Sequence, residues 1–134
     1  MGLDMYAYSR AKEKESKANE LQYWRKHNAL HGLLEDMWND KGQPIPQWMR
    51  DEYPEDFEQD RVIPFNGIEM ELTEADINYI ESVVMANELP ETEGFFFGGD
   101  SRFDEHNKAG DLEFIKKARE ALAKGEEVFY TSSW

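Results

Sequence analysis

Residues 3–9 read LDMYAYS, a stretch in which the apolar side chains recur at every second position. Leu3, Met5 and Ala7 share one face if this stretch is extended, because successive side chains of a strand point to opposite sides. The stretch EEVFYTSSW, residues 126–134, is likewise predicted to be a strand. The chain is therefore expected to begin and end in a sheet.

Helical and extended patterns interleave between these two strands. The expected elements are a helix from Leu21 to the stop signals of residues 42–46, a hairpin over 61–72, a helix capped by Thr73, a buried strand at 94–99 (GFFFGG) and a helix over 110–125 capped by Gly110 or Asp111. The spacing is not that of repeated βαβ units. The sequence therefore predicts one α+β domain over residues 1–134, a small and mostly antiparallel sheet covered by two or three helices.

An acidic excursion is expected at about residues 41–60. This stretch contains three prolines, two runs of acids and isolated aromatic side chains. Proline fixes the backbone and lacks an N–H donor, so this density favours a surface excursion over a regular element.

The net charge is concentrated in the middle of the chain. The whole sequence carries a formal charge of −14. Residues 51–107 hold seventeen acids against two basic residues, whereas the segments on either side are nearly neutral. Binding to DNA or RNA relies on lysine and arginine contacts to phosphate, so direct nucleic-acid binding is not expected. A partner protein with a basic surface fits this charge better.

The compartment is expected to be the cytoplasm. The chain has no cysteine, which excludes a disulfide framework and fits a reducing compartment. Its first residues lack the apolar core of a signal peptide, and no stretch approaches the ~20 apolar residues of a membrane span. We therefore expect a soluble protein without a cofactor, and a homodimer is one possible assembly.

The stretch YWRKHNALH, residues 23–31, is the candidate ligand site. On the predicted helix, Trp24, Asn28 and His31 fall on one stripe, and Arg25 and Lys26 flank it. An indole can stack on a base while a guanidinium binds phosphate oxygens. The simpler interpretation is that Trp24 packs in the core and the cations pair with acids.

A polar pocket is expected where this stretch meets the end of the chain. Asn28 and His31 are predicted to be partly buried, because a buried polar group needs a partner. The hydroxyls of Ser132 and Ser133 would complete the pocket, with Arg25 at its mouth.

The histidines of the same stretch have a spacing that can bind metal. His27, His31 and Glu35 are four residues apart, and two imidazoles one helical turn apart can meet one ion. However, His27 and Glu35 would lie about 12 Å apart along the axis, too far for one ion to take all three. A half-buried helix face is favoured, and no stoichiometric metal is expected.

The acids of the excursion are the candidate partner surface. They are Asp51, Glu52, Glu55, Asp56, Glu58 and Asp60. Together with nearby aromatic side chains they could imitate a phosphate backbone, although acidic surfaces are also common without such a role.

Four pieces of the sequence together resemble a group of short, uncharacterised phage and prophage proteins. The pieces are MGLDMYAY at the start, YWRKHNALH, GFFFG and the terminal YTSSW. Tyr23, Trp24, Arg25, Lys26, Asn28 and His31 match the helix motif of that group, and Ser132, Ser133 and Trp134 match its tail. The resemblance implies a phage accessory protein and no particular activity.

The leading hypothesis is a non-enzymatic, phage-type accessory protein. Its acidic surface would imitate nucleic acid and inhibit a host component such as a defence system. The rival hypothesis is a small-ligand protein that binds or hydrolyses a nucleotide-like molecule at Trp24, Arg25, Lys26, Asn28 and His31. In that case His31 would transfer the proton.

Overall fold

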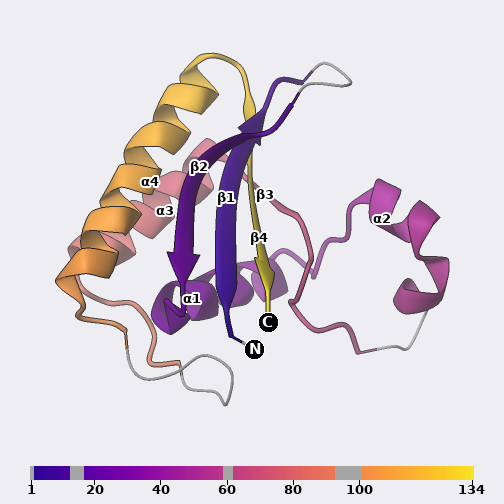
Figure 1. The fold of residues 1–134 in the computed structure, drawn as a ribbon, viewed down its shortest axis with the longest axis horizontal. Helices are drawn as coiled ribbons and strands as arrows, with labels where there is room; N and C mark the ends of the chain where they lie inside the picture. Colours follow the sequence, from indigo (N-terminus) through magenta and orange to yellow (C-terminus); the bar gives the residue numbers. More distant parts are fainter. Residues whose placement is uncertain (1, 13–16, 59–61, 93–100) are drawn as a thin grey trace.

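The computed structural model describes residues 2–12, 17–58, 62–92 and 101–134. These residues form a four-stranded antiparallel sheet in the order β2-β1-β4-β3, with helices beside it (Figure 1). The strands are β1 (Asp4–Arg10), β2 (Asn19–Arg25), β3 (Met70–Leu72) and β4 (Glu127–Ser133). The helices are α1 (Asn28–Asp40), α2 (Gln47–Glu52), α3 (Glu74–Met85) and α4 (Glu105–Ala123), with a 3-10 helix η1 (Pro54–Phe57). The expected α+β class is confirmed.

The two strands expected at the ends of the chain are confirmed, and they pair with each other. β1 runs antiparallel to β4, with Met5 opposite Ser132. Leu3, Met5 and Ala7 are fully buried, as their alternation predicts. Because β2 pairs with the other side of β1, the first strand lies inside the sheet rather than at its edge.

The helix expected from Leu21 is wrong over its first part. Residues up to Arg25 form strand β2, and the helix begins only at Asn28. Tyr23 lies opposite Tyr6 on β1, with ring centroids 5.3 Å apart. Aromatic side chains favour such cross-strand pairs, and these contacts between distant residues override the local helical spacing.

The chain turns sharply between β2 and α1. Lys26 adopts a positive φ of 57°, and its N–H donates to the carbonyl of Leu3 at 2.8 Å. His27 then stands at the N-cap of α1. Trp24, Asn28 and His31 therefore do not share a helix face, contrary to the prediction.

The hairpin expected over residues 61–72 is wrong apart from its last three residues. Of its described residues, 62–72, only Met70–Leu72 form a strand, and residues 62–69 run without strand pairing; Arg61 lies outside the described residues. Phe65 and Ile68 are both buried in the core, so this segment folds inward. Gly67, with φ 73°, donates its N–H to the carbonyl of Ser132 at 2.7 Å, which ties the turn to β4.

The helix capped by Thr73 is confirmed, whereas the start expected for the last helix is wrong. The Thr73 hydroxyl accepts from the N–H of Asp76, and the Asp76 carboxylate accepts from the N–H of Thr73. The last helix begins at Glu105 with Asp104 as its N-cap, not at residue 110 or 111. Its first turns lack an apolar pattern, so the sequence showed only the second part of it.

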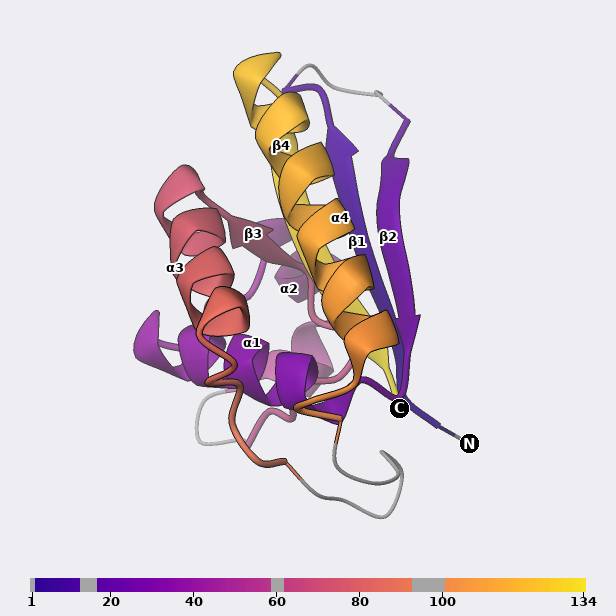
Figure 2. The same ribbon diagram turned by 90° about the vertical axis from the view of Figure 1, so that its left-hand side faces the viewer.

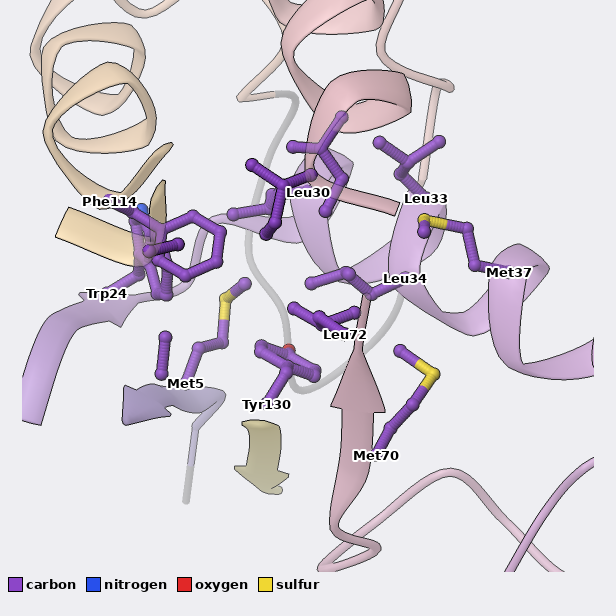
Figure 3. Packing of buried hydrophobic residues seen from close by; sticks show 14 of the residues in the cluster. Met5, Trp24, Leu30, Leu33, Leu34, Met37, Met70, Leu72, Phe114 and Tyr130 are labelled. Atoms are coloured by element: carbon purple, nitrogen blue, oxygen red, sulfur yellow. The ribbon is translucent and has the colours of Figure 1, made fainter. Parts of the chain in front are cut away.

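Three helices lie on one face of the sheet and enclose the core. α3 and α4 run beside the strands, and α1 crosses below them (Figure 2). Side chains from the strands and helices meet between these layers, with Met5, Leu34, Leu72 and Tyr130 at the centre of Figure 3. Among the described helices, none is long and apolar enough to cross a membrane.

The excursion carries short helices, where the sequence predicted no regular element. α2 and η1 stand to one side of the sheet in Figure 1. Pro46 precedes α2 and Pro54 opens η1, which agrees with the preference of proline for the first helical turn. Asp60 and the strand expected at 94–99 lie outside the described residues.

Candidate functional site

A groove lies between the excursion and the segment that follows it. It encloses about 390 Å³. We call it the excursion groove; its lining residues are Met49, Tyr53, Asp56, Phe57, Val62, Ile63, Pro64, Asn66 and Ile68. Met49 and Ile68 are buried and belong to the core, so the floor of the groove is anchored to the domain.

The excursion that forms one side of this groove carries exposed acidic and aromatic side chains. Asp51, Glu52, Glu55, Asp56 and Glu58 are all exposed. Two of the lining side chains are exposed, Tyr53 by 47% and Val62 by 93%. Trp48 on α2, which is not a lining residue, is 49% exposed. The excursion therefore combines an apolar hollow, lined by the carboxylate of Asp56, with further exposed carboxylates on the same segment, which suits an apolar side chain flanked by cations.

The residues expected to form the polar pocket are divided between the interior and the surface. Asn28, His31 and Ser132 are almost fully buried, whereas partial burial was expected for the first two. Lys26 and Ser133 are exposed. The structure therefore places Asn28, His31 and Ser132 in the interior of the protein. They do not line an open pocket of the kind that was expected.

His31 and the C-terminal strand do meet, through a residue that the sequence did not single out. Nδ1 of His31 lies 2.7 Å from the hydroxyl of Tyr130, which is two residues before Ser132 on β4. Burial lowers the pKa of His31 to about 4, and burial raises the pKa of Tyr130. A neutral, enclosed imidazole is poorly placed to exchange protons with a ligand, so this contact supports packing rather than hydrolysis.

Trp24 and Arg25 lie apart from that cluster. The indole of Trp24 is buried, which agrees with the simpler interpretation of its role, and its ring meets Phe114 edge-on with centroids 5.2 Å apart (Figure 3). Arg25 is exposed at the end of β2, beside α4. Both residues belong to strand β2, whereas the ligand-site prediction assumed that they lie on a helix.

A second buried polar cluster was missed by the sequence analysis. The Asp111 carboxylate accepts from Nε1 of Trp24 at 3.0 Å, and its other oxygen lies 3.0 Å from Nε2 of His27. Nδ1 of His27 lies 2.8 Å from the Ser101 hydroxyl, which accepts from the N–H of Ala29 at 3.0 Å. Burial raises the pKa of Asp111, and the hydrogen bonds from His27 and Trp24 oppose that rise.

This cluster has the composition of a nucleophilic site but the environment of a structural one. Serine, histidine and aspartate in a hydrogen-bonded line can activate the hydroxyl as a nucleophile. Here the side chains of His27 and Asp111 are each 1% exposed. The Ser101 hydroxyl also caps the first turn of α1 through Ala29. The cluster therefore joins α1, β2 and α4 within the core.

The signal for this cluster was present in the sequence. Asp111 lies four residues before Ile115 and seven before Ala118, which places a carboxylate in the apolar stripe of α4. A buried carboxylate needs donors, and the indole of Trp24 and the imidazole of His27, more than eighty residues earlier in the chain, supply them.

The histidines of residues 23–31 do not form a metal site with Glu35. His27 faces Asp111 and Ser101, whereas His31 faces Tyr130. Within the part of the chain that the structure describes, no group of three or more histidine or acidic side chains could hold a metal ion.

No family model, curated protein or solved structure matches this chain. The function is therefore argued from the geometry of the chain itself.

Proposed function

We propose that this chain is a non-enzymatic binding protein that holds a basic, partly apolar segment of a partner protein at the excursion groove. The observation that carries the proposal is an apolar hollow, lined by one exposed carboxylate, Asp56, on an excursion that carries four further exposed acids. An apolar anchor supplies most of the binding energy in such an interface, whereas rim charges select the partner and speed its approach.

The charge of the chain supports a partner that normally contacts nucleic acid. Proteins that bind DNA or RNA present lysine and arginine to phosphate groups. The excursion carboxylates would occupy those cations in place of phosphate. The resemblance to phage accessory proteins then points to a host protein, and inhibition of a host defence component follows from blocking its nucleic-acid site.

The test compares partner capture by three forms of the protein. The excursion variant carries Asp51→Asn, Glu52→Gln, Glu55→Gln and Asp56→Asn. The control variant removes four exposed acids elsewhere and so changes the net charge equally, through Asp36→Asn, Asp40→Asn, Glu88→Gln and Glu120→Gln. Each form is immobilised and exposed to a bacterial lysate, and captured proteins are identified by mass spectrometry.

The expected result is a protein with a basic surface that the wild type and the control variant retain and the excursion variant loses. Nucleic acid should compete with the chain for that protein. A partner captured equally by all three forms, or one that nucleic acid does not displace, would show that the excursion groove is not the binding site.

A further inference from the structure

The outer edge of β2 offers backbone hydrogen-bonding groups. Lys26 and Leu3 form a hydrogen-bonded pair, because the N–H of Lys26 donates to the carbonyl of Leu3. Hydrogen-bonded and non-hydrogen-bonded pairs alternate along an antiparallel ladder. Tyr23 and Arg25 lie three and one positions before Lys26, so they are in non-hydrogen-bonded pairs with β1. Their N–H and C=O groups therefore point away from β1, toward the edge where β2 has no neighbour among the described strands.

A groove runs between this edge and α4, and it is separate from the excursion groove. It encloses about 500 Å³. Its lining residues are Gln22, Tyr23, Trp24 and Arg25 of β2, with His106, Asn107, Ala109, Gly110 and Glu113 of α4. α4 lies beside β2 in Figure 1, and the two elements run in opposite directions (Figures 1 and 2). We call this the edge groove.

A glycine stands where α4 approaches β2. A Cβ added at Gly110 would lie 3.0 Å from Nε2 of Gln22 and 3.6 Å from Nε1 of Trp24. The helix is thus held near the strand at this point. A side chain entering the groove would meet the helix surface on one side and the strand edge on the other.

The edge groove is lined by an arginine at one end and a glutamate at the other. Arg25 and His106 lie at the end where β2 finishes and α4 begins, and both side chains are exposed. Glu113 is exposed seven residues after His106 on α4, which is about 10 Å at 1.5 Å per residue. Its carboxylate lies 3.8 Å from Nζ of Lys117, and because such an exposed ion pair is weak, a cation of a bound segment can take the place of Lys117. A strand covers that length in about three residues.

We propose that the edge groove binds an extended peptide segment of a partner protein, which adds to β2 as a further strand. An aspartate or glutamate of the peptide lies at Arg25 and His106, and a lysine or arginine lies toward Glu113. Backbone hydrogen bonds to Tyr23 and Arg25 supply affinity, and the charged ends set the register, as in other cases of strand addition beside a helix. The site lies at the sheet edge opposite to β3, so it does not depend on the proposed function of the excursion.

The probe is a displayed library of random nine-residue peptides, selected on the wild-type protein with the excursion variant as a second bait. The expected outcome is enrichment of peptides with an acidic residue and a basic residue two to four positions apart, on both baits. One enriched peptide is then synthesised, and its affinity is measured by fluorescence polarisation.

Backbone pairing is tested by Tyr23→Pro against Tyr23→Thr. Proline removes an N–H that faces outward, and edge strands tolerate it there, whereas threonine keeps the N–H and favours a strand. The affinity of the synthetic peptide should fall at least about tenfold more for Tyr23→Pro than for Tyr23→Thr. If Tyr23→Pro does not fold, amide hydrogen exchange on the wild type decides, and the peptide must protect the amides of Tyr23 and Arg25.

Charge matching is tested by Arg25→Glu against Lys116→Glu, which reverses an exposed charge on α4 outside the groove. Only the first should weaken binding, by at least about tenfold. The inference is wrong if no peptide is enriched, if Tyr23→Pro binds as Tyr23→Thr does, or if the peptide leaves the β2 amides unprotected. It is also wrong if sedimentation shows a dimer that Tyr23→Pro dissociates, because a second copy would then fill the edge.

Discussion

At the scale of single residues, buried polar side chains stabilise the interior by forming hydrogen bonds with one another. Asp111 lies on the buried face of α4 and accepts hydrogen bonds from groups that belong to β2 and to the start of α1. Such a carboxylate is stable in the core only while its donors remain, and each donor depends equally on the carboxylate. The cluster therefore links three elements with a geometry that apolar packing alone would not specify.

Removal of the Asp111 carboxylate should destabilise the protein strongly. Asp111→Ala leaves Nε1 of Trp24 and Nε2 of His27 without their acceptor in the core. Each unsatisfied buried donor costs about 1–3 kcal/mol, so with two such donors the free energy of unfolding should fall by about 2–6 kcal/mol. Urea denaturation measures the change, and Lys116→Ala on the exposed face of the same helix is the control. Equal stability of the two variants would contradict the structural role of the cluster.

The buried imidazole of His31 should make stability depend on pH. Its pKa is lowered to about 4 in the folded state by burial, against about 6.5 for an exposed histidine. The unfolded chain therefore binds the proton more readily. The stabilising contribution is complete above pH 6.5 and is lost progressively as the pH falls to 4, by about 3 kcal/mol in total.

The variant His31→Gln isolates this contribution from that of the acidic groups. The difference in unfolding free energy between wild type and variant, measured by urea denaturation from pH 7.5 to pH 4, should shrink as the pH falls. A difference that stays constant across this range would show that His31 is readily protonated in the folded protein.

At the scale of elements, the sequence predicts those whose pattern is complete within a short window. β1, β4 and α3 were predicted because alternation and the Thr73 cap are local signals. β2 was not predicted, since the aromatic residues that make it a strand act through Tyr6 and Phe114, which are distant in sequence.

The candidate site shows the same division between local and distant signals. The acids of the excursion could be named from composition, and those described are exposed. The apolar hollow between them could not be predicted, because it forms only when Met49 and Ile68 are anchored in the core. Ser101 was missed because its partners His27 and Ala29 are more than seventy residues away.

The capping box of α3 should contribute measurably to stability. Thr73→Ala removes the hydroxyl that accepts from the N–H of Asp76. The loss of an N-cap side chain costs about 1 kcal/mol, and Thr73→Ser should restore nearly all of it because serine supplies the same acceptor. Urea denaturation of both variants measures these changes. A loss that serine does not restore would assign the role of Thr73 to its methyl group instead.

At the scale of the whole molecule, the two grooves lie toward opposite edges of one sheet. β3 is at one edge and β2 at the other, with the excursion beyond β3 in Figure 1. The edge groove has a cationic end in a protein whose net charge is −14. The two surfaces therefore favour segments of different charge pattern, and one chain could hold both at once.

Binding of a basic partner at the excursion groove should depend on salt mainly through the association rate. Exposed carboxylates of the excursion attract a basic partner before contact, over a distance set by the electrostatic screening length. This length shortens from about 30 Å at 0.01 M salt to about 8 Å at 0.15 M. Electrostatic steering changes association rates by about 10- to 1,000-fold, whereas dissociation is governed by the buried anchor. We expect the association rate to fall at least about tenfold over this range and the dissociation rate to change little.

Two variants separate these contributions in a surface plasmon resonance measurement with the captured partner. The excursion variant should lower the association rate at low salt and abolish most of its salt dependence, because the steering carboxylates are gone. Tyr53→Ala, which empties part of the groove lining, should raise the dissociation rate and leave the salt dependence intact. If salt changed only the dissociation rate, the expectation would be wrong. The carboxylates would then be buried in the contact with the partner rather than steering its approach.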